Sequence, residues 1–239
     1  MDHATLIDRI ESKDARLVVI GLGYVGLPVA CLFADAGFNV TGLDVNQEKV
    51  DTINQGICPI EGKEPGLPEL VSRVVAEGNL RATTDYAACS DAQIILIAVE
   101  TPVDAETKKP AYRALRAALT DLGNHLAPGT MVIVESTLAP GTMTGLVEPL
   151  LEETSGLRVN EDVYLVNCPE RVMPGRLLRN LREMHRVVGG SSPEAADAAV
   201  AFYRHIVEVD LDPVDCLTAE LVKTMENAYR DVQIGFANE

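Results

Sequence analysis

Aromatic residues are scarce in this sequence. Of its 239 residues only 4% are Phe, Trp or Tyr, and Trp is absent, whereas hydrophobic residues of all kinds make up 47%. A chain of this length can fill one large α/β domain, or one domain and part of a second. We therefore expect a substantial core built mainly from aliphatic side chains.

Positive charge is also scarce. The chain has 20 Lys and Arg against 36 Asp and Glu, which gives a net charge of −16. Such a balance argues against a broad basic face and hence against a nucleic-acid partner. It does not exclude an anionic ligand, because a local pocket of backbone N–H groups can hold a phosphate within an acidic protein.

Long hydrophobic runs are missing. The longest strongly apolar run, residues 94–99, is far too short to span a bilayer. The first residues, "MDHATLIDRIESKDAR", lack the basic start and apolar centre of a signal peptide. We expect a cytoplasmic protein with no membrane partner.

The cysteines suggest neither a metal site nor a disulfide framework. There are five, an odd number, and none belongs to a C-x-x-C pair. The four histidines are scattered as well. The sequence therefore predicts no metal site.

Short apolar runs alternate with helical stretches along the chain. The predicted strands are residues 16–20, 38–44, 80–83, 93–99, 130–135, 162–167, 186–190 and 206–210. The predicted helices are residues 24–36, 46–54, 69–77, 112–126, 142–153 and 193–203. This alternation predicts an α/β fold with a doubly wound, Rossmann-type parallel sheet.

A glycine-rich turn follows the first predicted strand. Gly21, Gly23 and Gly26 fit G-x-G-x-x-G between a strand and a helix, the context in which this pattern binds a dinucleotide. Asp44 ends the next strand, where a carboxylate accepts hydrogen bonds from ribose hydroxyls and repels a 2′-phosphate, so NAD is favoured over NADP. The alternative is a tight strand–helix turn with an incidental Asp.

Two further loops lie at the ends of predicted strands, where ligands bind in such sheets. They are residues 99–102 and residues 135–142. Ser136 and Thr137 in the second loop can contact a ligand or cap the helix that follows, because Ser and Thr are good helix caps. The residues alone do not separate these two interpretations.

The final stretch, from Ala219 to Glu239, is typical of a strong helix. Apolar residues recur on it at steps of three and four: Val222, Met225, Tyr229, Val232 and Phe236. A neighbouring polar stripe contains Lys223, Asn227 and Arg230. By spacing alone, this polar stripe is a solvated face with salt bridges such as Glu220 to Lys223 or Lys223 to Glu226.

Several motifs resemble the UDP-glucose/GDP-mannose dehydrogenase family over almost the whole chain. They are "VIGLGYVGLPVA", "GLDVN", "EPGL", "ETPVD", "VIVESTLAPGT", "NCPERVMPGRLL", "RVVGG" and "AELVKTMENAYRDVQIGFANE". The sixth and eighth are most similar to the UDP-N-acetylmannosamine dehydrogenases. Where the UDP-glucose branch carries a second Glu, this chain has Pro174, which points to an N-acetylhexosamine nucleotide. UDP-N-acetylglucosamine and UDP-glucose remain the alternative substrates.

The resemblance implies a reaction and a set of site residues. Family members oxidise the sugar C6 alcohol twice with two NAD+, through an aldehyde and a Cys thioester, to the uronic acid. By motif, Lys223 and Asn227 handle the reacting oxygen, and Thr137 orders a water near the reacting carbon. Glu170 is the base for thioester hydrolysis, and Arg171 contacts the sugar nucleotide. The cofactor residues are Gly21, Gly23, Tyr24, Val25, Gly26, Asp44, Lys49, Thr101 and Thr137.

The resemblance also implies how the chain is organised. We expect an N-terminal extension at residues 1–14, an NAD-binding Rossmann domain at 15–211, and the start of a long connector helix at 212–239. In the family a second, UDP-binding domain follows and carries the nucleophile in a G-G-x-C motif, which this sequence lacks. We therefore expect the N-terminal portion of an enzyme, which binds NAD but does not complete the oxidation.

Two further expectations follow from this organisation. Cys168 lies within the matched motif "NCPERVMPGRLL", directly before Pro169 and Glu170, and we favour packing over a catalytic role for it. The connector helix builds the dimer interface in the family, so a homodimer through this helix is expected. The alternative of another class is a non-enzymatic NAD-binding module.

Overall fold

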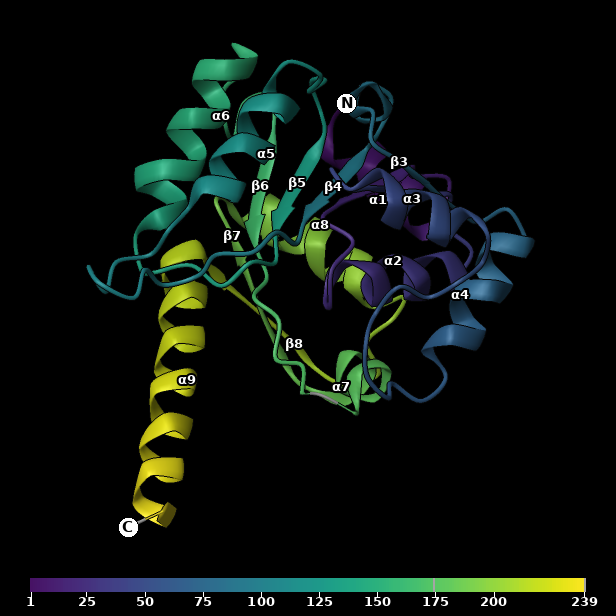
Figure 1. Cartoon of the computed structure of the whole chain (residues 1–239). Coiled ribbons are helices and arrows are strands. Elements are labelled where there is room, and N and C mark those ends of the chain that lie inside the picture. Colours follow the sequence, from purple (N-terminus) through teal and green to yellow (C-terminus); the bar gives the residue numbers. More distant parts are fainter. Residues whose placement is uncertain (174, 239) are drawn as a thin grey trace.

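The computed structural model describes residues 1–173 and 175–238 and is built around one eight-stranded sheet (Figure 1). The strand order is β3-β2-β1-β4-β5-β6-β7-β8. The strands are β1 (Leu17–Ile20), β2 (Val40–Leu43), β3 (Leu80–Thr83), β4 (Ile94–Ile97), β5 (Met131–Val134), β6 (Tyr164–Asn167), β7 (Arg186–Gly190) and β8 (Leu211–Asp215). The sheet is mostly parallel, which confirms the predicted doubly wound α/β fold.

Two helical layers cover the two faces of the sheet. One contains α1 (His3–Glu11), α2 (Gly26–Asp35), α3 (Gln47–Asn54), α4 (Leu67–Ala76), α7 (Leu177–Glu183) and α8 (Pro193–Tyr203). The other contains the 3-10 helix η1 (Tyr86–Cys89), α5 (Arg113–Gly123), the π-helix η2 (Met143–Val147) and α6 (Glu148–Ser155). Side chains alternate between the layers along each strand, so Leu17 and Val19 enter one core and Val18 and Ile20 the other.

The core is aliphatic with one aromatic exception. Phe33 of α2 stacks on Phe202 of α8 with ring centroids 3.9 Å apart, and Phe38 meets both rings edge-on. Three of the four phenylalanines therefore meet at one point, where two helices approach each other. Aromatic pairs of this kind add stabilisation beyond the area that they bury.

The direction of β7 departs from the predicted all-parallel order. β7 runs antiparallel to β6, with Val166 opposite Gly190 and Asn167 opposite Gly189. A parallel neighbour needs a crossover that carries the chain back along the sheet. Between β6 and β7 the described residues contain one short helix, α7, and the next strand returns in the opposite direction. β8 then follows β7 in parallel through α8.

The last strand lies five residues later than predicted. Residues 206–210 were expected to form it, but β8 spans Leu211–Asp215. Ile206 and Val207 are buried in the turn after α8, where they pack into the core. The strand itself is half-exposed at the edge of the sheet, a position in which a residue without a backbone N–H, such as Pro213, is tolerated. The prediction of the last strand from the apolar residues of 206–210 was therefore wrong.

Three short helices lack a clear signal in the sequence: α1, η1 and α7. Residues 1–14, expected as an extension, contain α1, which Asp2 caps by accepting from the Thr5 N–H at 2.9 Å. Leu6 and Ile10 of α1 are fully buried in the core shared with α8.

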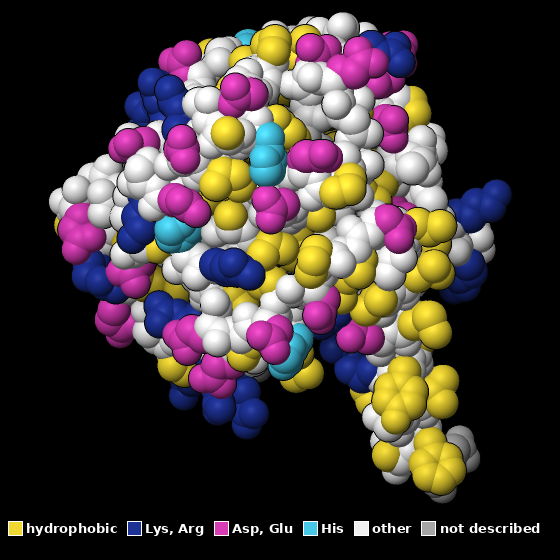
Figure 2. All heavy atoms as spheres, turned by 180° about the vertical axis from the view of Figure 1, so that it is seen from behind, with side chains coloured by type: hydrophobic (Ala, Val, Ile, Leu, Met, Phe, Trp, Pro, Cys, Tyr) yellow, Lys and Arg dark blue, Asp and Glu magenta, His cyan; other side chains and the backbone are white. Residues whose placement is uncertain are grey.

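Helix α9 (Cys216–Asn238) starts against the sheet and then leaves the rest of the chain (Figure 1). Its buried residues, Cys216, Ala219, Glu220 and Lys223, all lie in the first turns. Figure 2 shows hydrophobic side chains gathered on the projecting part, where Met225 is 67% exposed and Phe236 85%. Among residues 1–173 and 175–238 no helix is long and apolar enough to cross a membrane.

Candidate functional site

The glycine-rich turn links β1 to α2, and two of its glycines are needed for close approach. Gly21 has φ +92°, and a Cβ there would lie 2.6 Å from the carbonyl oxygen of Ala98. A Cβ on Gly26 would lie 1.8 Å from the Gly21 carbonyl oxygen. A Cβ on Gly23 would meet nothing within 4 Å, so this backbone faces open space. This arrangement fits a pyrophosphate placed against Gly23 at the start of α2.

Asp44 organises the end of β2 beside this turn. Its Oδ2 accepts a hydrogen bond from the Leu22 N–H at 2.9 Å, and its Oδ1 accepts one from the Asn46 N–H at 3.0 Å. Lys49 places its Nζ 2.7 Å from Oδ2. The structure thus brings the glycine turn, Asp44 and Lys49 together, as predicted.

A cavity of about 580 Å3 opens at the carboxyl ends of β1, β2 and β4. Gly21, Gly23, Asp44 and Lys49 line one side of it. The opposite side contains residues that the motifs did not reveal, namely Tyr86 of η1 and Arg113 and Asp121 of α5. Burial, followed by the nearby Asp121, raises the pKa of Tyr86 to about 12. These residues follow no motif, because only the packing of η1 and α5 beside the sheet brings them to the cavity.

Tyr24 and Val25 lie within the turn but face elsewhere. Tyr24 donates its hydroxyl hydrogen bond to Oε1 of Glu64, which lies in the loop before α4. Val25 is the residue before the first turn of α2 and packs against the core. The contact of Tyr24 and Val25 with the cofactor stays a prediction.

The loops after β4 and β5 are tied to each other. Thr101 donates its hydroxyl to the carbonyl oxygen of Thr137 at 2.7 Å, and Ser136 donates its hydroxyl to the carbonyl oxygen of Val99 at 2.7 Å. Ser136 therefore does not cap a helix, and η2 follows Thr142 instead. The side chain of Thr137 is exposed at this edge of the sheet.

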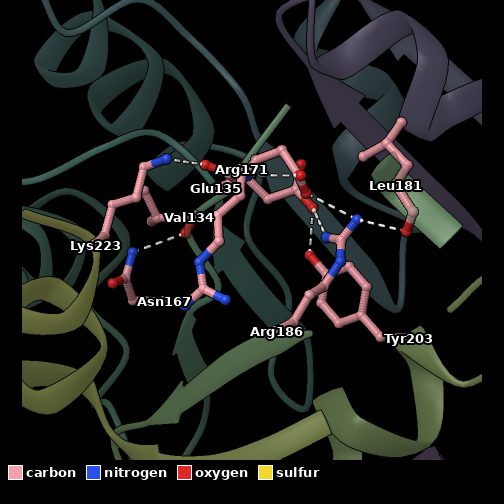
Figure 3. Close-up of polar contacts among 9 residues, drawn as sticks. Val134, Glu135, Asn167, Arg171, Leu181, Arg186, Tyr203 and Lys223 are labelled. Carbon is pink, nitrogen blue, oxygen red and sulfur yellow. Dashed lines mark hydrogen bonds and ion pairs between the residues drawn. The ribbon is translucent and has the colours of Figure 1, made fainter. Parts of the chain in front are cut away.

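The first turns of α9 dock on the loop after β5. Buried Glu220 accepts hydrogen bonds from the N–H groups of Gly141 at 2.6 Å and Met143 at 2.7 Å. Lys223 is buried too and donates to the carbonyl oxygen of Glu170 (Figure 3). A solvated face with salt bridges is therefore the wrong interpretation for these two residues. Burial lowers the pKa of Lys223.

Asn227 and Arg171 lie near Lys223. Asn227, one turn further along α9, is half-buried and accepts a hydrogen bond from Arg230 at 3.3 Å. Arg171 has its Nε 2.6 Å from a carboxylate oxygen of Glu226. The structure thus gathers Lys223, Asn227 and the Glu170–Arg171 backbone. Pro174, used above to separate the sugar substrates, lies outside the described residues.

The carboxylate and the backbone carbonyl of Glu170 have different partners, which are Arg186 and Lys223, respectively. One of its oxygens lies 2.8 Å from Nη2 of Arg186, which also reaches Glu135 at 3.4 Å. Tyr203 donates its hydroxyl to Glu135 at 2.6 Å, and its ring packs 4.9 Å from the Arg186 guanidinium. The predicted base is thus one member of a buried cluster formed by Glu135, Glu170, Arg186 and Tyr203.

The charge balance of this cluster favours a proton on Glu135. One guanidinium serves two carboxylates, all of them buried. Burial raises the pKa of Glu135 to about 7 despite Arg186, and the neighbouring Glu170 carboxylate adds to the effect. Sequence motifs did not single out Glu135, Arg186 or Tyr203 for this role.

All five cysteines are free and have thiols with raised pKa values. Burial is the main cause in each case, and it raises the pKa of Cys168, Cys89 and Cys216 to about 12. Cys168 is fully buried in the core, which confirms the packing interpretation. A reactive Cys needs an accessible, electropositive setting, and this chain offers none to its thiols.

A comparison of the sequence with known protein families shows to which family the chain belongs. Residues 15–207 match the NAD binding domain of the UDP-glucose/GDP-mannose dehydrogenase family. The chain belongs to this family. NAD is the cofactor of this domain, in agreement with the glycine turn and Asp44.

Curated relatives are similar to almost all of this chain. A UDP-N-acetyl-D-mannosamine dehydrogenase from Pyrococcus horikoshii is 38% identical over 94% of the chain, which covers 52% of that protein. An NDP-N-acetyl-D-galactosaminuronic acid dehydrogenase from Ralstonia nicotianae is 40% identical over 98% of the chain, which covers 55% of it. The chain therefore spans about half the length of the curated relatives that it matches.

Solved structures of family members also superpose on almost all of this chain and are covered by it over about half of their own length. The UDP-D-ManNAc dehydrogenase of Pyrococcus horikoshii superposes with a TM-score of 0.88 at 37% identity, over 93% of this chain and 52% of that one. The GDP-mannose dehydrogenase of Pseudomonas aeruginosa gives 0.88 at 28% identity, over 93% and 51%. The fold is shared by enzymes named for different sugar nucleotides.

Proposed function

We propose that this chain is the NAD-binding half of a dehydrogenase that oxidises the C6 alcohol of UDP-N-acetylmannosamine to the uronic acid with two NAD+. The single observation that carries the proposal is the buried contact of Lys223 with the Glu170 carbonyl, beside the loops after β4 and β5. A buried amine with a lowered pKa can donate to a developing oxyanion and exchange a proton with it.

The other site residues have supporting roles in this proposal. The Asn227 amide is a second donor for the reacting oxygen, and Thr137 orders a water near the reacting carbon. Arg171 contacts the sugar nucleotide. NAD, when bound, accepts the hydride. Glu170 was expected to be the base for the final hydrolysis, and its carboxylate would have to leave Arg186 to reach the reacting carbon.

The sugar is proposed from the relatives. UDP-N-acetylmannosamine is in the name of one relative, whereas the other is named for an N-acetylgalactosaminuronic acid nucleotide. The alternative substrates are other N-acetylhexosamine nucleotides, such as UDP-N-acetylglucosamine. UDP-glucose is a less favoured alternative than these. A cytoplasmic location stays a prediction.

A homodimer through α9 is part of the proposal. The projecting helix exposes Met225, Tyr229, Val232, Ile234 and Phe236. Exposed apolar surface of this kind marks a partner surface in many proteins. A second copy of the same helix can cover it.

Cofactor binding is tested by calorimetric titration of the chain with NAD+ and with NADP+. We expect NAD+ to bind at least about tenfold more tightly, because Asp44 repels a 2′-phosphate. The Asp44→Asn variant, which keeps an acceptor oxygen but removes the charge, should narrow this preference. Equal binding of the two cofactors by the native chain would contradict the assignment.

Oxidation is tested by NADH absorbance after mixing the chain with NAD+ and UDP-N-acetylmannosamine. We expect a flat trace, because none of the five thiols is set up as a nucleophile. Steady turnover would contradict this account, and Cys168→Ser would then be the first variant to assay. The alternative of a non-enzymatic NAD-binding module is tested by the calorimetric titration. It would be ruled out if the folded chain did not bind NAD.

The choice of sugar needs a separate assay. If the gene encodes residues after Glu239, its full product is given UDP-N-acetylmannosamine, UDP-N-acetylglucosamine and UDP-glucose in parallel. The first is expected to have the highest kcat/KM, and a higher value for either of the others would replace it in the proposal.

A further inference from the structure

One buried carboxylate, that of Glu64, joins three separate segments of the chain. Its Oε1 accepts hydrogen bonds from the Tyr24 hydroxyl and from the Gly175 N–H, the latter at 2.7 Å. Its Oε2 accepts one from the Leu177 N–H at 3.2 Å. Glu64 itself lies in the loop between α3 and α4 and is only 8% exposed.

Hydrogen bonds stabilise the ionised form of the Glu64 carboxylate. Burial alone would raise its pKa, but the hydrogen bonds from Gly175, Tyr24 and Leu177 leave it below the ordinary value. An ionised carboxylate that accepts three hydrogen bonds makes stronger contacts than a neutral acceptor. Leu177 is the first residue of α7, so Glu64 also binds a free N–H at the start of that helix.

The segments that Glu64 joins belong to the two sides of the site. Tyr24 lies in the glycine turn, between Gly23 and Gly26. Gly175 and Leu177 lie at the end of the segment after β6, of which residues 168–173 and 175–177 are described and which contains the Glu170 carbonyl that receives Lys223. Residues that are separated by 111 and 113 positions from Glu64 are thereby fixed relative to the turn.

We propose that Glu64 is a positioning residue that couples NAD binding at the glycine turn to the order of residues 168–173 and 175–177. A bound pyrophosphate restrains the backbone of the turn, and hence Tyr24. A restrained Tyr24 hydroxyl keeps Glu64 in place to hold the N–H groups of Gly175 and Leu177. The segment that presents the Glu170 carbonyl to Lys223 is then more ordered with cofactor than without it.

This inference rests on the proposed function only in that NAD binds at the glycine turn. A purely structural Glu64 would stabilise residues 168–173 and 175–177 equally with and without NAD. Coupling instead makes their protection depend on NAD, and it requires the same factor in the reverse direction, so that loss of the Tyr24–Glu64 contact weakens NAD binding.

The test is amide hydrogen exchange of Gly175 and Leu177 in the chain alone and in the chain saturated with NAD+. In the native chain, NAD+ should slow exchange of both amides by about fivefold or more. In Tyr24→Phe, which removes one hydroxyl, this slowing should be lost even though NAD+ is added to saturation. Glu64→Gln should lose it as well.

The matched control is Tyr164→Phe, which removes a tyrosine hydroxyl from β6, where the Tyr164 ring lies 6.2 Å from the ring of His3. It should keep the full NAD-dependent slowing. Equal slowing in Tyr24→Phe and in the native chain would overturn the coupling, as would NAD binding without any slowing. Failure of the proposed function gives a different result, because calorimetry would then detect no NAD binding. If Glu64→Gln does not fold, Tyr24→Phe decides the matter alone.

Discussion

Asp44 on the cofactor side of the site makes contacts close in the sequence, whereas α9 and residues 168–173 and 175–177 are held by contacts between distant residues. Asp44 binds the backbone of Leu22 and Asn46 and the side chain of Lys49, at most 22 positions away. Lys223 meets Glu170 across 53 positions, and Glu220 meets Gly141 across 79. Substitutions on the first side should therefore affect ligand binding more than folding, and those on the second side should affect folding first.

The largest effect is expected for Arg186→Met, which breaks the distant side. Removal of the guanidinium leaves the carboxylates of Glu135 and Glu170 buried without a cation, so the free energy of unfolding should fall by about 3–5 kcal/mol. Urea unfolding above neutral pH measures the loss. The control is Arg179→Met, whose pair with Glu183 is exposed and should contribute little. Equal losses in both variants would contradict the comparison.

Two glycine substitutions sharpen the comparison on the cofactor side. Gly26→Ala forces a Cβ to within 1.8 Å of the Gly21 carbonyl, so we expect a loss of about 1–3 kcal/mol in unfolding free energy and loss of NAD binding. Gly23→Ala meets no protein atom, so stability should change by less than about 1 kcal/mol while NAD affinity falls about tenfold or more. Unfolding and calorimetry are measured on both variants. Undiminished NAD affinity in Gly23→Ala would remove the pyrophosphate from this place.

The proton on Glu135 should give the distant side a pH dependence that the cofactor side lacks. Because folding raises the pKa of Glu135 from 4.5 to about 7, the folded state holds the proton more tightly. This stabilisation is present at low pH and is lost as the pH rises through about 7. The difference in unfolding free energy between the native chain and Glu135→Gln should therefore vary between pH 4.5 and about pH 7 and should be constant above about pH 7. A constant difference would show that Glu135 ionises normally.

The smallest effect on stability is expected on the projecting part of α9. Met225→Ser and Phe236→Ser replace exposed side chains, so the free energy of unfolding of the monomer should change by less than about 0.5 kcal/mol. If the helix forms a homodimer, the pair of substitutions should shift sedimentation to the monomer. Identical sedimentation of the native chain and the double variant would argue against this interface.

Much of the fold and part of the site could be predicted from the sequence. β3 and β7 have the predicted bounds, and the glycine turn, Asp44 and Lys49 meet as expected. The position of β8 was wrong because an apolar run packs equally well in a turn over the core as in a strand. The buried cluster around Arg186 was missed because charged residues give no periodic signal of burial, and its members come from β7, α8 and the ends of β5 and β6.

The sequence by itself determined the alternation of strands and helices and the NAD-binding turn, since these depend on periodicity and on contacts over a few residues. Only the tertiary structure decided that Glu220 and Lys223 are buried rather than solvated, and that Glu170 points to Arg186 while its carbonyl meets Lys223. The helical spacing of α9 is compatible with either environment. The choice depends on which loops pack against its first turns, and those loops are brought there by the whole sheet.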